Sequence, residues 1–569
     1  MSNLLKNIVD FLPKMAFRQL ISISSAIFLA LHVSAQVKID ENGDIESTEI
    51  IIEKNKKITF PEAPRKFEKI PPAPKKNTVE PKEYTYKEFQ TPLPDLESKI
   101  KIATIKDELS SRKKNNYVRA GAGNYFTSYF EGQLLYKTNP KFQTGLHARH
   151  FGAMRGPVKN SGNSSNLIEG NAKYFFKKSI LSGSLHYTRS AINYYGYNQS
   201  LKNNNDSKFQ DSIYQVYQQF HATAELKQID TLTKKQYYFR ANYYTFGNRY
   251  KNSENEVEAL GFVGYEIDPE SKIRINGNLS ASNYSDSSGS LPRYLFNVKP
   301  EYERKLLDNK LIARGGINFA YDNDTLQSTK RIHVYPTVHL DYELLPKLHA
   351  LAGVDGGMEK NTYRQYATQN PFLGLNPLLL HTNKRYEFYG GFEGNISPTI
   401  NFKSLLSYAN YQNMSVYVNG VADSSRFDVF YAKNASVLKL RTDLGYEPSQ
   451  ALKIGLRATY FHYQTDTISH AWHRPAFDAT AYVNYNMFNK LWFSAEAYYL
   501  AGIKAKNYQS GNEYTLDDII DINLSANYKI NERFSVFLYF YNILAQKYER
   551  YYQYPVRGIT IVGGLTYTF

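Results

Sequence analysis

The sequence predicts an all-β fold, a transmembrane antiparallel β-barrel of about 22 strands that occupies residues 116–569. Three observations predict it. Apolar and polar residues alternate in segments of about 11 to 15 residues, a length that suits tilted strands crossing a bilayer. Short turns and long loops alternate between these segments. Aromatic residues make up 15% of the chain, with 50 Tyr and 33 Phe, as the two interfacial girdles of such a barrel require.

The composition excludes several other classes of protein. A mean hydropathy of −0.52 excludes a bundle of transmembrane helices, because each helix needs about 20 consecutive apolar residues. The absence of Cys excludes disulfides, thiolate metal sites and Cys nucleophiles. The net charge of +16 could attract nucleic acid or an acidic substrate, but no nucleic-acid motif is present. We therefore assign the excess Lys and Arg to turns, loops and lumen, and expect no nucleic-acid partner.

Residues 1–35 have the three parts of a signal peptide. A basic region ends at Arg18, an apolar region covers 20–31, and small residues precede a cleavage site between Ala35 and Gln36. The Ser-Ala-Gln ending is similar to that of signal peptides common in Bacteroidetes. We expect export across the inner membrane of a Gram-negative cell.

Residues 36–115 form a periplasmic segment rich in Pro and Lys. Eight prolines lie between positions 61 and 94. Because Pro lacks a backbone donor and fixes φ, we expect this segment to be extended or partly disordered. One apolar run, 49–53, has two interpretations that the sequence leaves open. It could add as a strand to the sheet of a partner, or it could be an apolar patch in a tail.

The alternation that predicts strands is clearest near the end of the chain. In 520–529, Ile, Leu, Ala and Tyr alternate with Asp, Asn, Ser and Lys. The segments 273–282, 333–342 and 477–486 show the same period of two, and no helical domain interrupts the series. A soluble sandwich alternates too, but its strands are usually about five or six residues long. The length of the segments therefore favours a barrel.

The connections predict the topology. With the chain end on the periplasmic side, counting backwards places short turns there and long loops outside. The short turns are Asn139-Pro140, Lys178-Ser179, Asp230-Thr231, Asp268-Pro269, Asp308-Asn309, Pro346-Lys347, Ser397-Pro398, Pro448-Ser449, Phe488-Asn489 and Asn531-Glu532. The long loops are 153–164, 198–212, 284–291, 322–331, 360–384, 412–435, 466–475, 502–518 and 546–557. The first strand begins near Tyr117, and eleven hairpins are expected.

The last strand carries an assembly signal. Leu565, Tyr567 and Phe569 share one face of the alternating segment 559–569. Outer-membrane assembly machinery recognises a terminal aromatic residue on such a strand. We therefore expect this machinery as a partner during biogenesis, and outer-membrane lipid as the final surroundings.

The end of the chain resembles the barrel end of TonB-dependent receptors. The resembling residues are 541–548 (Tyr-Asn-Ile-Leu-Ala-Gln-Lys-Tyr), 554–558 (Tyr-Pro-Val-Arg-Gly) and the terminal aromatic strand. The resemblance implies a barrel of about 22 strands that imports a solute. It also implies a globular plug, yet 36–115 contains no Gly-rich strand-turn pattern of a plug. The candidates for filling the lumen are the Pro-rich segment, the long loops and a second protein.

Two groups of residues are candidates for function. Candidate lumen-wall residues are His333, His339, Asp341, Glu343, His147 and Arg149, which could form an acid–base pair or line hydrated wall. Candidate binding residues of the outer loops are Tyr194, Tyr195, Tyr197, Tyr551, Tyr552 and Tyr554, because Tyr stacks on sugars and protein surfaces. No phosphate loop, zinc spacing or nucleophile elbow is present, so we expect no enzyme, no cofactor and no metal site.

The sequence supports two hypotheses of function in the cell outer membrane. The favoured one is a transport-class barrel, related to TonB-dependent receptors, that admits or imports a solute with a partner supplying plug or lid. The alternative is a non-transporting structural subunit of an outer-membrane complex. It would dock through its Pro-rich segment and outer loops to a surface lipoprotein or a periplasmic protein.

Overall fold

The computed structural model describes residues 116–569 except 140, 201–205, 230–232 and 325–330. Residues 1–115 lie outside the described part. The expected signal peptide, its cleavage between Ala35 and Gln36, and the expected periplasmic segment 36–115 therefore stay predictions.

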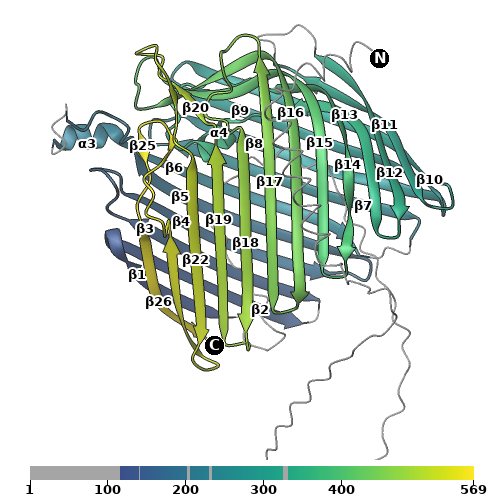
Figure 1. Ribbon diagram of the computed structural model, residues 1–569, viewed down its shortest axis with the longest axis horizontal. Coiled ribbons are helices and arrows are strands. Elements are labelled where there is room, and N and C mark those ends of the chain that lie inside the picture. Colours follow the sequence, from purple (N-terminus) through teal and green to yellow (C-terminus); the bar gives the residue numbers. More distant parts are fainter. Residues whose placement is uncertain (1–115, 140, 201–205, 230–232, 325–330) are drawn as a thin grey trace, which may run out of the picture. The chain divides into compact units, whose positions relative to one another are not determined.

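Twenty-two strands form the barrel, which confirms the predicted fold and strand number. They are β1 (Tyr117–Gly123), β2 (Thr127–Asn139), β3 (Phe142–Ala153), β4 (Asn163–Phe175), β5 (Ser179–Asn193), β6 (Tyr214–Gln228), β7 (Lys235–Asn248), β8 (Ser253–Asp268), β9 (Ser271–Asp286), β10 (Gly289–Leu306), β11 (Leu311–Asp322), β12 (Ile332–Leu345), β13 (Leu348–Glu359), β14 (Thr382–Ser397), β15 (Ile400–Asn419), β16 (Phe427–Ser449), β17 (Leu452–Thr465), β18 (Phe477–Met487), β19 (Leu491–Ala501), β22 (Ile519–Lys529), β23 (Phe534–Tyr541) and β26 (Thr560–Thr568). Each strand pairs antiparallel with the next of this series, and β26 closes the ring on β1 (Figure 1).

The remaining elements lie in the connections. They are the helices η1 (Asn124–Phe126), α3 (Ser207–Ile213) and α4 (Tyr363–Gln369), and the short ladders β20 (Lys504–Lys506) with β21 (Glu513–Thr515) and β24 (Glu549–Tyr551) with β25 (Tyr554–Pro555). Within the described residues, no helix has both the length and the hydropathy needed to span a bilayer.

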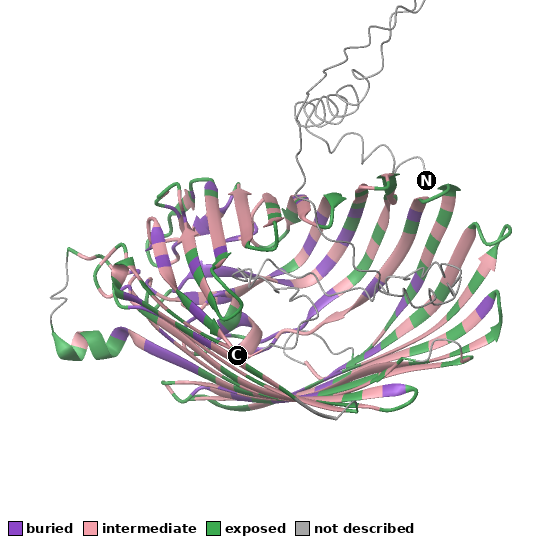
Figure 2. Cartoon of the chain, turned by 90° about the horizontal axis from the view of Figure 1, so that it is seen from below, coloured by how far each residue is buried: buried purple, intermediate pink, exposed green. Residues whose placement is uncertain are grey.

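The exposed face of the strands is apolar. On β12, Val334 and Val338 are 56% and 41% exposed, whereas Tyr335 between them is 4% exposed. Figure 2 shows this alternation of exposure along many strands of the barrel. In a soluble sheet the exposed face is polar, whereas in a membrane barrel it faces lipid. The apolar exterior therefore explains the period of two in the sequence.

The barrel has two different ends. The end that holds Phe569, here the turn end, carries the short connections within two residues of the predicted turns wherever those residues are described. The opposite end, here the loop end, carries the long connections. Two predicted loops are wrong in extent: β15 and β16 leave only 420–426 between them, and β9 and β10 leave only 287–288. Polar residues that extend a paired strand look like a loop in the sequence, because pairing leaves no local signal.

Two further connections at the loop end are too short for the sequence pattern to reveal. They are η1, between β1 and β2, and residues 249–252, between β7 and β8. Neither connection contains a Pro or a Gly, since η1 is Asn-Tyr-Phe and 249–252 is Arg-Tyr-Lys-Asn. The predicted number of strands is correct because these two hairpins complete the series.

Candidate functional site

The connection between β13 and β14, residues 360–381, crosses the loop end of the barrel, and we call it the bridging loop. Tyr217 on β6 donates a hydrogen bond from its hydroxyl to the carbonyl oxygen of Pro371 at 3.0 Å. On the other side, the amide of Phe427 on β16 donates to the carbonyl oxygen of Phe372 at 3.0 Å. Since β6 and β16 lie ten strands apart in a ring of 22, the loop joins nearly opposite walls.

A buried aromatic cluster surrounds the bridging loop, and together they form what we call the cap. Its buried members are Tyr217, Phe246, Tyr284, Tyr363, Tyr366, Ala367, Leu373, Leu379, Tyr417, Phe427, Val429, Tyr551 and Tyr554. They come from the bridging loop itself, from strands around the ring and from the connection that follows β23. Burial of each large side chain stabilises the arrangement by about 1.5 to 3 kcal/mol. The cap is therefore a hydrophobic core across the loop end.

Helix α4 holds the bridging loop against β8 (Figure 1). The helix begins with a capping box, in which Thr362 and Gln365 bond each other's backbone amides. The carboxylate of Glu254 on β8 accepts from the amides of Tyr363 at 3.2 Å and Arg364 at 2.9 Å. These are amides that an isolated first turn leaves unpaired, and the helix dipole favours an anion there.

Two cations of the bridging loop pair with the next acids of β8. Lys360 Nζ lies 2.5 Å from carboxylate oxygens of both Glu256 and Glu258. Arg364 Nη2 lies 3.0 Å from Glu256, and its guanidinium stacks 3.8 Å from the ring centre of Tyr244. Glu256 is 1% exposed, so an uncompensated charge there would be costly. We call these ion pairs, with the bonds of Glu254, the acid latch.

Arg293 on β10 fastens both ends of the bridging loop. The side chain is 2% exposed. Its Nη1 donates to the carbonyl oxygen of Asn361 at 2.5 Å, and its Nη2 donates to His381 Nδ1 at 3.1 Å. Nη2 also lies 3.3 Å from Asp324. Burial first, and then the charge of Arg293, hold the pKa of His381 well below its usual range.

A second buried histidine lies in the connection between β17 and β18. His473 is 2% exposed and packs edge-on against Phe427, with ring centres 5.1 Å apart. Its Nδ1 donates to the carbonyl oxygen of Tyr417 at 2.8 Å, and its Nε2 accepts from the amide of Tyr552 at 3.4 Å. Burial lowers the pKa of His473 to about 3.

The predicted wall residues of β12 contact side chains of β12, β13 and β14. His339 Nδ1 lies 2.8 Å from the hydroxyl of Tyr389, and Asp341 lies 2.6 Å from His349 Nδ1. His333 stacks on Tyr335, with ring centres 6.3 Å apart. Glu343 stands opposite His349 in the register with β13.

The predicted pair on β3 contacts or faces the neighbouring strand β2. His147 Nε2 lies 3.1 Å from Glu131 on β2, and Arg149 stands opposite Glu131 in the register. Further round the ring, His186 and His221 stack with ring centres 5.1 Å apart. In the described part of the chain, no three His, Asp or Glu side chains converge as a metal site requires.

The predicted loop tyrosines are packed inside the cap or beside it. Tyr194 is fully buried, and its hydroxyl donates to Leu373. Tyr551 and Tyr554 are 9% and 2% exposed. Their hydroxyls donate to the carbonyl oxygens of Gln369 and Ser425. In this structure these three side chains hold the loops together and are closed to a ligand.

The other three tyrosines are half-buried. The hydroxyl of Tyr195 donates to Pro555, the hydroxyl of Tyr197 accepts from Asn160, and Tyr552 stacks on the ring of Tyr514. These contacts also join separate loops.

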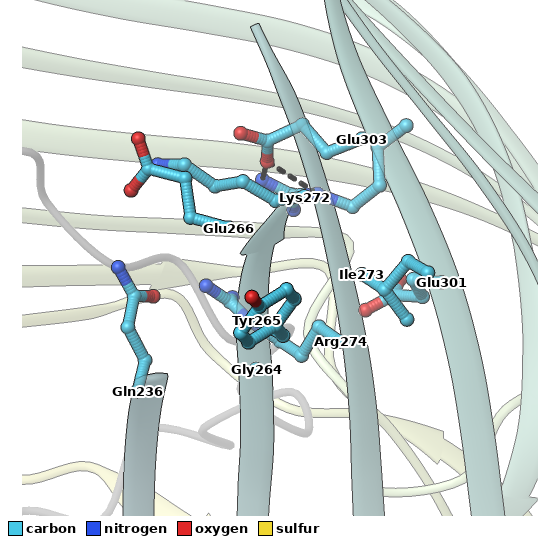
Figure 3. A pocket seen from close by; sticks show the side chains of 10 residues that line it. Gln236, Gly264, Tyr265, Glu266, Lys272, Ile273, Arg274, Glu301 and Glu303 are labelled. Atoms are coloured by element: carbon cyan, nitrogen blue, oxygen red, sulfur yellow. Dashed lines mark hydrogen bonds and ion pairs between the residues drawn. The ribbon is translucent and has the colours of Figure 1, made fainter. Parts of the chain in front are cut away.

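A shallow pocket lies on the wall between β7 and β11, lined by Gln236, Gly264, Tyr265, Glu266, Lys272, Ile273, Arg274, Glu301, Glu303 and Arg314 (Figure 3). Acidic and basic side chains alternate around it. Arg314 Nη2 lies 2.7 Å from Glu303. The pocket is an ion-paired part of the wall and brings no catalytic set together.

The sequence reasoning did not identify Glu254, Glu256, Lys360, Arg364 or His381. A signal was present for the acids, because Glu occupies three successive positions of one face, 254, 256 and 258. Like charges stacked on one face of a strand repel, so such a run indicates cations from elsewhere. Nothing local indicates which cations supply the pairing.

Comparison with known proteins identifies the fold. No protein-family model matches the chain, and no curated protein matches its sequence. Among solved structures, the FrpB iron transporter from Neisseria meningitidis superposes with a TM-score of 0.61 at 10% identity, covering 81% of this chain and 82% of that one. The ferric enterobactin receptor PfeA from Pseudomonas aeruginosa gives 0.56 at 11% identity, covering 80% and 81%.

A third solved structure, the siderophore receptor PirA from Pseudomonas aeruginosa, gives a TM-score of 0.54 at 11% identity, covering 80% of this chain and 79% of that one. At such identities the likeness shows the fold alone. Together with the lipid-facing exterior, it shows that the chain is a large β-barrel of the cell outer membrane.

Proposed function

We propose that this protein is a transport-class barrel that admits or imports a solute through the outer membrane, and that its own cap is the gate. The observation that carries the proposal is the bridging loop, which joins nearly opposite walls and buries an aromatic cluster between them. Among the residues that the structure describes, the contacts of the long loops support them as the candidate that closes the lumen. A partner that supplies a plug is then not required for closure.

The acid latch makes the gate separable from the barrel. Its partners lie on β8 and on the bridging loop, so removing the cations weakens this attachment of the loop without altering any strand. The acids left behind would repel one another and disfavour the closed position. The barrel itself keeps its full ladder of backbone hydrogen bonds.

Conductance of the purified full-length protein in planar bilayers tests the proposal. We expect wild type to conduct rarely, and Lys360→Ala/Arg364→Ala to raise the open fraction at least tenfold. Lys208→Ala/Lys251→Ala removes two exposed loop-end cations outside the cap and should match wild type. A further arm deletes residues 37–115. Silence in every arm would overturn the transport proposal, and conductance only after the deletion would make that segment the gate.

The alternative is the non-transporting structural subunit. A loop end closed by a hydrophobic core suits such a subunit as well as a gated channel. Affinity purification from native membranes, with and without residues 37–115, separates the two. A stoichiometric lipoprotein or periplasmic partner that is lost with the deletion, together with no conductance, would favour the subunit.

A further inference from the structure

The cap contains two imidazoles whose partners require the neutral ring. His381 Nδ1 receives the N–H of Arg293 Nη2 at 3.1 Å and the amide of Asn361 at 3.2 Å. A guanidinium and an amide N–H can only donate, so Nδ1 must present its lone pair. The single ring proton of His381 is therefore on Nε2.

His473 has the opposite tautomer for the same kind of reason. Its Nδ1 faces the carbonyl oxygen of Tyr417 at 2.8 Å and must donate. Its Nε2 faces the amide of Tyr552 at 3.4 Å and must accept. A second proton on either histidine would therefore oppose a donor with a donor. At His381 the bonds from Arg293 and Asn361 would be lost, and at His473 the bond from the amide of Tyr552.

The surroundings of His381 do not offset a positive charge. Arg293 comes from β10 and Lys360 from the bridging loop, while Asp322 from β11, Asp324 from the next connection and His333 from β12 line the space beside the ring. Asp324 is engaged by Arg293 and by the backbone amide of His381, at 2.9 Å from the latter. In the described part of the chain, neither carboxylate has a hydrogen bond to the ring.

The surroundings of His473 are also unfavourable to a cation. Arg550 donates to the carbonyl oxygen of His473 at 2.8 Å, and the amide of His473 donates to the carbonyl oxygen of Lys504. The rings of Phe427 and Tyr551 cover the imidazole. The nearby charge is thus positive.

We propose that the cap is an acid-operated gate in which His381 and His473 are the proton sensors. Proton uptake by His381 breaks the bonds that its Nδ1 accepts, and so releases the His381 end of the bridging loop from Arg293. Proton uptake by His473 breaks the bond between the connections after β17 and β23. Both imidazoles enter water when the cap opens, and the charge is then hydrated. This inference rests on the proposed function, because it gives that gate its signal.

The direction of the pH effect follows from the linkage between proton binding and opening of the cap. In the open cap both histidines regain a pKa near the ordinary value of about 6.5, whereas the closed cap lowers the pKa of each. The open form therefore binds more protons below that value. The contribution of each histidine to closure is complete above it and is lost as the pH falls. Below about pH 6.5 the open-to-closed ratio should rise by at most about tenfold per pH unit for each histidine, hence by at most about a hundredfold for both.

The absence of Cys permits a direct measurement of opening. Ala367 is 3% exposed in the cap, so Ala367→Cys in the full-length protein reacts with a maleimide only when the cap opens. Ser288→Cys, in the exposed turn after β9, corrects for thiol ionisation. We expect the ratio of the two labelling rates in lipid vesicles to rise by at most about two decades per pH unit below about pH 6.5.

Four variants test the sensors. His381→Asn and His473→Gln each place an amide oxygen near the position of the ring nitrogen that accepts a hydrogen bond. Each variant alone should halve the slope of the labelling-rate ratio against pH. The double variant should label independently of pH. His349→Asn removes a wall histidine that pairs with Asp341 outside the cap, and it should keep the full slope. Labelling at pH 7.5 that equals wild type shows that each variant has folded.

Two results would overturn the inference: a flat ratio in the wild-type background, or an unchanged slope in the double variant. Conductance of the same preparations separates this outcome from failure of the proposed function. If acid opens the cap but the barrel does not conduct, the transport proposal is overturned and the proposal of an acid-operated cap stands. If the barrel conducts but its labelling does not depend on pH, the proposal of an acid-operated cap is overturned and the transport proposal stands.

Discussion

At the scale of single residues, the closure of the barrel depends on glycines. Gly121 on β1 and Gly564 on β26 stand opposite each other, and Phe537 on β23 is opposite Gly564 in the next pair. A Cβ built on either glycine would lie 2.7 or 2.6 Å from Cζ of Phe537. The ring therefore fills the space that two side chains would need, and it is only 1% exposed.

We expect Gly564→Ala to destabilise the barrel. Its Cβ would lie 2.1 Å from the carbonyl oxygen of Ala120, which belongs to the backbone and cannot rotate away. Overpacking of this kind costs about 1 to 3 kcal/mol. Urea unfolding in lipid, followed on gels that separate folded from unfolded barrel, measures the change. Gly277→Ala is the matched control, because no atom lies within 4 Å of its Cβ. Equal effects of the two substitutions would contradict the packing argument.

At the scale of elements, β8 and α4 depend on each other. The helix has seven residues, too few to be stable alone in water. The strand presents Glu254 and Glu256, each 1% exposed, which need partners in so dry a place. The contacts between these acids and the amides and cations at the start of α4 stabilise the helix and give the buried carboxylates their partners. A short helix and an acidic strand face are thus stable only in contact.

We expect Glu254→Gln to loosen the cap. The amide keeps the shape but removes the charge that the helix N-terminus favours, at a cost of about 0.5 to 2 kcal/mol. Labelling of Ala367→Cys at pH 7.5 should then rise roughly twofold to thirtyfold. Glu266→Gln, at the turn end of the same strand, should leave the labelling unchanged. If both variants behave like wild type, Glu254 does not hold the loop.

At the scale of the whole molecule, the last strand serves both closure and assembly. On β26 the side chains of Leu565 and Tyr567 are 59% and 37% exposed on the lipid face, and Phe569 beyond the strand is 44% exposed. The predicted assembly signal is thus on the accessible side of the strand. Whether the assembly machinery reads it stays a prediction.

We expect Phe569→Ala to reduce the amount of folded barrel in the outer membrane several-fold, because the terminal aromatic is the predicted recognition element. The folded fraction in membrane extracts, resolved by heat-dependent migration, is the measurement. Thr568→Ala alters the neighbouring residue, which pairs with Tyr117 on β1, and should assemble normally. Normal assembly of both variants would assign recognition to other residues.

The sequence predicted the strands because period-two alternation is a local property. The residues from Ile332 to Leu345 alternate whatever their neighbours are, and lipid on one side enforces the pattern. The extent of the loop-end connections was not predictable in the same way. Residues 412–419 continue β15 because β16 pairs with them, and nothing within the segment records that pairing.

The sequence by itself determined the barrel and its last strand, since both follow from local alternation. The number of 22 strands is correct although two short loop-end connections leave no signal in the sequence. Only the tertiary structure decided how the loop end is closed. The bridging loop contacts β8 although more than a hundred residues separate them in the sequence, as in the ion pair between Arg364 and Glu256. Contacts between such distant residues leave no periodicity in either segment. Three of the loop tyrosines that suggest a binding surface in the sequence, Tyr194, Tyr551 and Tyr554, are buried for the same reason: their partners come from other loops.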